Sequence, residues 1–459
     1  MSTSILHIKP EELDSVEKRR KHRFSIIGCG RNGVLHACLF AEAGFKIICV
    51  DADRALVNRL KRGKSPFLKD KVEPLLKKHV KNGSVEAITD VKAAVAQSDV
   101  ILITTQAKIE RKKKVNYSDV EKICKQVGSS LRRGSLVIVM SVVGPATAER
   151  LIRQTLENTS GFKVGVHFGL AYSPVRISDQ QNLEKLADCK RIVAATDKDS
   201  LNVALFVLGT VAKKDVVETN DVKTAEAAML FESVQHYTNV ALANEFACFC
   251  EKAGMDYHKA KELAETSARG TLVSPTLPCR NLCEEPYLLL EEAENLNVRL
   301  RIPAVAREIN EEILKHAVSL IRESLRSCGK TLRRAKISLL GISQTPNMKD
   351  SPKVSAEKLA KILETKGAKV SLYDPFLSGK DLADLGHRVK KKFAEATEGV
   401  DCIVILTGHD RFKRLNLKKL KIMTRMPAAV VDFEGVVDPE KVEREGFIYR
   451  GLGRGVWTK

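Results

Sequence analysis

Aromatic residues are scarce in this chain: they make up 5% of its 459 residues, and only one is tryptophan. Proteins that bind nucleic acid by stacking its bases need aromatic side chains among their basic ones. The formal net charge of +20 includes basic clusters at 18–23 and 111–114, and neither is interleaved with stacking residues. We therefore interpret the basic surface as solvated and able to attract small phosphorylated ligands, and we do not expect nucleic acid as a partner.

Long apolar runs are also missing. The first 23 residues hold no apolar core like that of a signal peptide. No run reaches the roughly 20 residues that span a bilayer, and the longest candidate, SLVIVMSVVGPA from Ser135, is typical of a buried strand. Eleven cysteines without a secretion signal or zinc spacing indicate reduced thiols. We expect a cytoplasmic protein with no membrane span and no metal site.

Short β-branched runs alternate with helical segments over 23–218, as in a parallel sheet with crossover helices. The expected strands there are FSIIGCG, KIICVD, VILITT, SLVIVMS, KVGVHFG and RIVAAT. Residues 221–252 contain no glycine or proline and predict one helix of roughly 45 Å, which would bridge domains or form a dimer seam. Residues 331–459 resume the alternation, with strands KISLLGIS, KVSLYDP, DCIVILTG and AAVVDF. The predicted fold is α/β, with two Rossmann-like doubly wound domains joined by a long central helix and a helical dimerisation core.

Three glycines form the sequence GCGRNG between a predicted strand and a predicted helix. Gly28 suits the tight turn, Gly30 the close approach of a pyrophosphate, and Gly33 the packing of the helix on the sheet. Asp51 closes the next strand, where its carboxylate can accept hydrogen bonds from an adenosine ribose. This pattern predicts an NAD site, and the alternative is a purely structural glycine turn.

Other residues near this motif are candidates for binding the same cofactor. Arg31 and Asn32 open the helix, whose N-terminus supplies N–H groups for phosphates. Asp51 favours NAD over NADP, and Arg54 is near enough in sequence to soften that preference. Thr105 and Ser141 end two further predicted strands and are also expected to contact the cofactor.

Several short sequence segments together resemble the UDP-glucose/GDP-mannose dehydrogenase family over nearly all of the chain after Phe24. They are AYSPVRI from Ala171, AEAAMLFESVQHYTNVALANEFA from Ala225, EPYLL from Glu285, AREIN from Ala306, LYDPF from Leu372 and VILTGHDRF from Val404. The resemblance implies a homodimer through the 221–252 helix and oxidation of a nucleotide-sugar alcohol to a carboxylate with two NAD, through a cysteine thiohemiacetal. It also implies a role in polysaccharide biosynthesis. The expected domains are a basic N-terminal extension (1–22), an NAD-binding Rossmann domain (23–218), a central helical domain (219–330) and a C-terminal Rossmann-like domain for the nucleotide sugar (331–459).

Two charged residues that the resemblance implies for catalysis are replaced. The family's glutamate follows Ser-Pro, but Ser173 and its proline are followed here by Val175, with Arg176 retained. The family's lysine comes three residues after the glutamate of AEA, a position that holds Met229. The resemblance still assigns Tyr172, Ser173 and Arg176 to substrate binding.

The family's nucleophilic cysteine belongs to a loop resembling PGPGVGGHCIPKDPY. Alignment on EPY places Asn281 at the cysteine, so Cys279 and Cys283 each miss that position by two residues. In the C-terminal domain, Thr345 and Pro352 replace the lysine and arginine that reach the nucleotide sugar. The replaced positions are those of catalysis and sugar binding, while the segments that resemble the rest of the family fold are retained.

Three hypotheses follow. The first is an oxidoreductase that moves a hydride from a nucleotide-sugar alcohol to NAD without the cysteine, with His236, Asn239 and Asn281 as candidate catalytic residues. The second is a catalytically inactive NAD-binding homologue with a regulatory or partner role. The third is the family reaction with a shifted loop, which brings Cys279 or Cys283 into place.

Overall fold

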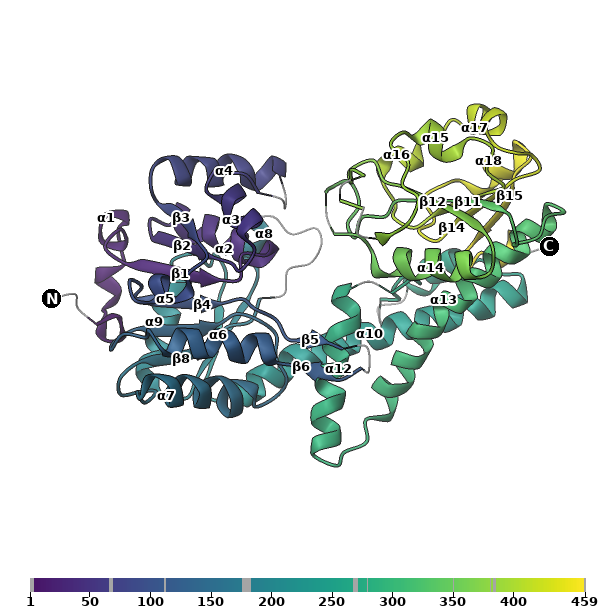
Figure 1. The fold of residues 1–459 in the computed structure, drawn as a ribbon. Coiled ribbons are helices and arrows are strands. Elements are labelled where there is room, and N and C mark those ends of the chain that lie inside the picture. The colour runs from purple at the N-terminus through teal and green to yellow at the C-terminus, as the bar shows by residue number, and fades with distance from the viewer. Residues whose placement is uncertain are drawn as a thin grey trace. The chain divides into compact units, whose positions relative to one another are not determined.

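The computed structural model describes residues 4–65, 69–110, 113–175, 183–266, 271–278, 280–349, 351–379, 381–382 and 385–457. The chain forms two compact units, residues 1–232 with 287–298 and residues 233–286 with 299–459 (Figure 1). Helices α10 (Val222–Ala253) and α12 (Arg280–Asn295) each have residues in both units. None of the helices in the described ranges is long and apolar enough to cross a membrane.

The first unit is built on an eight-stranded sheet with the order β10-β9-β8-β7-β4-β1-β2-β3. Its strands are β1 (Arg23–Ile27), β2 (Lys46–Val50), β3 (Val85–Ile88), β4 (Val100–Ile103), β7 (Leu136–Val139), β8 (Gly169–Tyr172), β9 (Arg191–Ala195) and β10 (Val216–Thr219). Neighbouring strands are parallel except β8 and β9. From β3 to β8 the strands therefore follow the 3-2-1-4-5-6 order of a dinucleotide-binding domain.

Amphipathic helices cover this sheet. In α6 (Ser118–Gly128), the buried residues Val120, Cys124 and Val127 recur at helical spacing, which turns one face of the helix toward the core. Helix α6 packs against α5 (Val91–Val95) and α7 (Gln154–Ser160), and α2 (Arg31–Glu42) packs against α4 (Lys69–Lys81). The remaining elements are α3 (Arg54–Leu60), the hairpin of β5 (Lys108–Ile109) and β6 (Val115–Asn116), the π-helical turn η3 (Ala148–Arg153), α8 (Leu183–Asp188) and α9 (Lys198–Gly209).

The N-terminal segment packs on this unit. It forms η1 (Ile5–His7), η2 (Pro10–Glu12) and α1 (Val16–Arg19). The guanidinium of Arg19 donates to the carbonyls of Leu13, Asp14 and Ala43. Element η1 contacts α9, and the buried apolar residues of the segment are Ile5, Leu6, Ile8 and Leu13.

The second unit contains a five-stranded parallel sheet with the order β12-β11-β13-β14-β15. Its strands are β11 (Lys336–Leu340), β12 (Lys369–Tyr373), β13 (Cys402–Ile405), β14 (Ala429–Asp432) and β15 (Ile448–Gly451). Its helices are α11 (Tyr257–Ala264), α13 (Arg301–Ser327), α14 (Val354–Thr365), α15 (Phe393–Thr397), α16 (Asp410–Lys413), α17 (Leu417–Met423), α18 (Pro439–Arg444) and η5 (Gly455–Trp457), with parts of α10 and α12. The 2-1-3-4-5 order is the second common doubly wound arrangement, so the expected α/β fold is confirmed.

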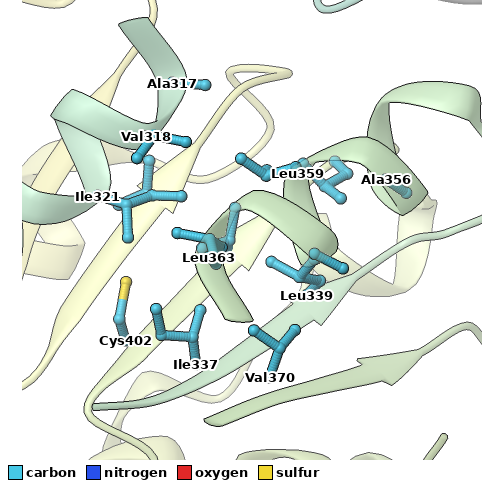
Figure 2. Close-up of a cluster of buried hydrophobic side chains, with 14 of the residues drawn as sticks. Ala317, Val318, Ile321, Ile337, Leu339, Ala356, Leu359, Leu363, Val370 and Cys402 are labelled. Atoms are coloured by element: carbon cyan, nitrogen blue, oxygen red, sulfur yellow. The ribbon is translucent and has the colours of Figure 1, made fainter. Parts of the chain in front are cut away.

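The core of the second unit joins its helices to its sheet (Figure 2). Helix α13 contributes Ala317 and Ile321, and α14 contributes Leu359 and Leu363, all fully buried with the strand residue Ile337. Packing of this kind fixes the sheet against the helices, so the loops beyond the strands are held in defined positions.

One expected strand of the first unit is wrong. Residues 163–169 were expected to form a strand, but Gly165 has a φ of +76° and the His167 N–H donates to the Lys163 carbonyl at 2.9 Å, so the chain turns back. Strand β8 begins only at Gly169. Strands β3, β10 and β15 were not predicted, and each lies at an edge of its sheet.

Candidate functional site

The glycine-rich turn between β1 and α2 has a different geometry at each glycine. Gly28 has a φ of +100°, which L side chains rarely adopt, and its N–H donates to the Val50 carbonyl at 2.9 Å. A Cβ on Gly33 would lie 2.1 Å from the Gly28 carbonyl oxygen, so the helix can approach the turn only without a side chain there. A Cβ on Gly30, the N-cap of α2, would meet no atom of the described residues within 4 Å. This open approach to a helix N-terminus fits a pyrophosphate.

The carboxylate of Asp51 is fixed beside this turn. Its Oδ2 accepts the Cys29 N–H at 2.7 Å, and its Oδ1 accepts the Asp53 N–H at 3.0 Å. Asp51 is half-buried at the end of β2, where an acid suits the hydroxyl groups of a ribose. The predicted residues Arg31 and Asn32 are the first two residues of α2.

The predicted residue Arg54 lies beside a cavity. Arg54 is the first residue of α3 and is exposed. The cavity has a volume of about 390 Å³ and lies beyond the ends of β2 and β3. Its lining residues are Arg54, Val57, Asn58, Lys61, Ile88, Thr89, Asp90 and Ala93. The mixture of apolar and polar side chains suits the adenosine end of a dinucleotide.

Further predicted residues follow neighbouring strands of the same sheet. Strands β1, β4, β7 and β8 are adjacent and parallel, so Thr105, Ser141 and Ser173 lie along the edge that also carries the glycine turn. The Thr105 hydroxyl is 3.5 Å from the Ile27 carbonyl. The hydroxyl groups of Ser141 and Ser173 are buried and have no hydrogen-bond partner within the described part of the chain. Tyr172, the last residue of β8, is buried.

The two positions that lack the family's charged residues are buried and apolar. Val175 is 5% exposed, and its N–H donates to the Met140 carbonyl at 3.4 Å. Met229, on α10, is 8% exposed. Neither side chain can accept or donate a proton, so neither can perform the acid–base or oxyanion chemistry expected at these positions. Arg176 lies outside the described residues.

Glu226 fixes a loop of this unit, although it is not among the site residues predicted from the sequence. It lies on α10 and is fully buried, and its carboxylate accepts the N–H groups of Ala146 at 2.5 Å and Ala148 at 2.8 Å. Burial raises the pKa of Glu226 to about 8, although the two N–H groups act in the opposite direction. The glutamate thus holds the loop after β7 in place. The one sequence signal for this role is its position in the segment AEA, which resembles the family.

The loop that Glu226 holds contains a strained residue. Ala146 has a φ of +65°, a conformation that costs a residue with a Cβ about 1–2 kcal/mol. We expect Ala146→Gly to stabilise the first unit by about 1 kcal/mol, measured as a higher midpoint of urea denaturation. Ala55→Gly, at an exposed position in α3, is the matched control and is expected to destabilise by about 1 kcal/mol. A lower midpoint for Ala146→Gly would contradict the strain argument.

The predicted catalytic residues on α10 are accessible to solvent. His236 and Asn239 are both exposed. Asn239 lines a cavity of about 30 Å³ in the second unit. The other lining residues of this cavity are Leu242, Ala243, Tyr257, Thr271, Leu272 and Val273. Ser233, on the same helix, is buried.

The stretch expected to carry the nucleophile is partly helical. Cys279 lies outside the described residues. The backbone of Asn281 and Cys283 is helical, since both lie in α12, which begins at Arg280. The segment 271–278 before it is tied to the second unit by Asn244, whose side chain bonds both the N–H of Thr276, at 3.0 Å, and its carbonyl, at 3.3 Å. Asn244 lies in the segment ALANE and is not among the residues that the sequence predicts for the site.

The second unit repeats the arrangement of turn and acid. Asp374 follows β12, and its Oδ2 accepts the N–H groups of Ile342 and Ser343, each at 2.7 Å. His409 Nδ1 accepts the Asn347 N–H at 2.9 Å, and Nε2 donates to Asp374 at 3.2 Å. This buried network fixes the loop after β11. That loop carries the predicted positions Thr345, which is buried, and Pro352, which is half-buried.

The glycine turn, the acid beyond β2 and the strand order define a dinucleotide-binding α/β protein with a second doubly wound unit. The chain belongs to the UDP-glucose/GDP-mannose dehydrogenase family. Models of that family's NAD binding domain, central domain and UDP binding domain match residues 22–208, 223–312 and 338–439. The predicted family and the predicted cofactor, NAD, are confirmed, and the UDP binding domain supports a nucleotide-sugar ligand.

Relatives of the whole chain are known. A UDP-N-acetyl-D-mannosamine dehydrogenase of Pyrococcus horikoshii is 28% identical over 435 residues, which cover 94% of this chain and 99% of the relative. A solved structure of UDP-D-ManNAc dehydrogenase from the same organism has a TM-score of 0.85 at 27% identity and covers 95% of this chain and 100% of that one. A UDP-glucose dehydrogenase from Pyrobaculum islandicum shares the fold, with a TM-score of 0.82 at 23% identity over 94% of this chain and 98% of that one. The family and the two matches from Pyrococcus horikoshii support NAD-dependent nucleotide-sugar dehydrogenase function.

Proposed function

We propose that this chain oxidises an alcohol group of a nucleotide sugar, such as a UDP-sugar, by one hydride transfer to NAD and does not use the cysteine route. The observation that carries the proposal is the contrast between an intact dinucleotide turn and the buried, uncharged Val175 and Met229. Bound NAD supplies the hydride acceptor. A single two-electron oxidation needs an oriented cofactor and a base, but no thiol.

The residues of this chain would bind the cofactor and accept the proton. Gly30 and the N-terminus of α2 would bind the pyrophosphate, and Asp51 the ribose. As the carbon–hydrogen bond breaks, the hydroxyl proton must go to a base, and a carbonyl forms. Of the predicted catalytic residues, His236 can accept this proton, while the amides of Asn239 and Asn281 can only form hydrogen bonds.

Counting NADH tests the proposal. The purified protein is mixed with NAD and a panel of UDP- and GDP-sugars, and NADH formation is recorded together with NAD affinity. One NADH for each sugar oxidised is the expected result. Two would favour the cysteine route through Cys279 or Cys283. NAD binding without turnover would favour an inactive homologue with a regulatory or partner role, which the losses at Val175 and Met229 also permit.

The assigned base makes a sharper prediction. His236→Gln is expected to lower kcat about 100-fold or more while NAD affinity stays unchanged, because only the proton acceptor is removed. His7→Gln, at an exposed position of η1, is the control and is expected to leave both quantities unchanged. Equal kcat values for the two variants would remove His236 from the mechanism.

We also propose a homodimer that forms through α10. Leu242, Phe246 and Phe249 recur at helical spacing and are all exposed, with Phe249 64% accessible. On α13, Ile302 and Val305 are exposed as well. An apolar stripe of this kind is stabilised when a second copy covers it.

The oligomeric state checks the dimer. The double variant Phe246→Glu with Phe249→Glu is expected to be monomeric in analytical ultracentrifugation, while the wild type sediments as a dimer, because carboxylates would be buried at the seam. Ile422→Glu, at an apolar position that is 85% exposed on α17, should leave the dimer intact. A monomeric wild type would contradict the proposal.

A further inference from the structure

A buried positive charge lies in the first unit outside the dinucleotide turn. Arg191, the first residue of β9, is 1% exposed. Its Nη2 donates to the Leu186 carbonyl at 3.3 Å, while Nε and Nη1 have no hydrogen-bond partner among the described residues. A guanidinium remains charged in proteins, so burial leaves both the charge and two donor nitrogens without compensation.

Two titratable side chains, His36 and Cys189, interact with Arg191, and neither is a carboxylate that would supply the missing negative charge. His36, on α2, is 1% exposed, and its Nδ1 donates to the Asn32 carbonyl at 2.8 Å. Burial and the charge of Arg191 lower the pKa of His36 to about 3, so its ring is neutral at physiological pH. No carboxylate of the described residues acts on Arg191, and the one charge interaction that opposes the effect of burial on its pKa comes from Cys189. An anion beside this buried cation would therefore offset much of the free-energy cost of its burial.

The position of Arg191 relates it to the ligand-binding edge. Strand β9 is antiparallel to β8, with Ala195 opposite Ala171 and Ala194 opposite Tyr172. Strand β9 therefore begins on the side where β8 ends, which is the carboxyl edge of the parallel strands. Helix α8, whose Leu186 carbonyl accepts the Arg191 bond, packs against α2. An anion at Arg191 would thus lie behind the helix that follows the glycine turn.

We propose that Arg191 holds a small monovalent anion of the halide class in the first unit. Because Arg191 is 1% exposed, its surroundings favour a small ion over a large one. A monovalent anion also sheds its water at a lower cost than phosphate or sulfate, because the desolvation cost rises with charge. The anion would accept from Nε or Nη1 and offset the charge of the guanidinium. It would stabilise the packing of β9 and α8 against α2.

Anion-dependent unfolding tests the site. The Tm of the full chain is measured in sodium chloride, sodium bromide, sodium gluconate and sodium sulfate at equal ionic strength. We expect chloride and bromide, but neither gluconate nor sulfate, to raise the Tm by about 2–4 °C in a saturable way. Arg191→Met, an apolar replacement of similar length, should lose this dependence and match or exceed the wild type without halide. Arg153→Met, at a partly exposed arginine of the same unit, should keep it.

Bromide also locates the ion directly. Crystals of the wild type grown in bromide are expected to show an anomalous peak within hydrogen-bond distance of Nε or Nη1 of Arg191. Absence of that peak, or a Tm that responds equally to all four salts, would overturn the proposal. If Arg191→Met fails to fold, the wild-type salt series and the bromide crystal still decide it.

Discussion

Gly33→Ala is expected to destabilise the first unit by about 1–3 kcal/mol and to weaken NAD binding at least tenfold, because its Cβ would lie 2.1 Å from the Gly28 carbonyl oxygen. The atom in the way belongs to the backbone, so no side-chain rotation can relieve the clash. The turn and the helix must move apart, and the helix N-terminus then no longer faces the pyrophosphate. Urea denaturation and isothermal titration with NAD would measure the two effects.

Gly30→Ala separates binding from folding. A Cβ at Gly30 meets none of the described protein atoms within 4 Å, so stability should stay nearly unchanged while NAD affinity falls. Gly209→Ala, near the end of α9, also meets open space and should change neither quantity unfavourably. Unchanged NAD affinity in both Gly30→Ala and Gly33→Ala would show that the dinucleotide does not lie on this turn.

Glu251→Ala is expected to destabilise the second unit by about 3–5 kcal/mol, because the substitution breaks a buried ion pair. Glu251, on α10, is buried, and its carboxylate pairs with His316 Nε2 at 2.7 Å and accepts the Gly453 N–H at 2.8 Å. Removal of the carboxylate therefore leaves His316 without its ion-pair partner and the Gly453 N–H without its acceptor. Urea denaturation at pH 6 is the measurement, and Glu245→Gln, at an exposed position on the same helix, is the control.

The same pair should make stability depend on pH. Burial alone would lower the pKa of His316, but hydrogen bonds with Cys248 and Glu251 raise it to about 10. A histidine whose folded pKa is raised contributes stability that is complete below its unfolded pKa of about 6.5 and is lost as the pH rises through about 10. The free energy of unfolding should therefore fall from pH 6.5 to 10 in the wild type and fall less in His316→Gln. Parallel profiles would contradict the ion pair.

The sequence predicts most of the fold because the central strands carry a local pattern. Strand β1, before Gly28, and strand β13, after Asp401, lie inside their sheets and are almost entirely buried and mostly apolar. The edge strand β10 has no fully buried residue, so its side chains show no pattern that separates it from a loop. The strand expected at 163–169 failed because Gly165 turns the chain within an apolar run.

Some residues of the candidate site can likewise be predicted from local sequence patterns, and others cannot. The roles expected of the three glycines and Asp51 depend on neighbouring residues, so their spacing alone suggests them. Glu226 meets Ala146 across 80 residues of sequence, and Asn244 meets Asn310 across 66. No local pattern records such contacts, since they depend on how distant elements pack. The absence of charge at Val175 and Met229 could be seen only against a family pattern.

The packed N-terminal segment has a consequence for how the chain is made. Ser4 bonds the Gly134 carbonyl across 130 residues, and η1 contacts α9, which ends at Gly209. At 5–20 residues per second, a ribosome needs roughly 10–40 s to make the 200 residues in between. During that time the segment that holds Ile5 and Leu6 lacks its contacts with α9. Residues 5–7 are thus among the last of their unit to complete their native contacts, although they are synthesised long before α9.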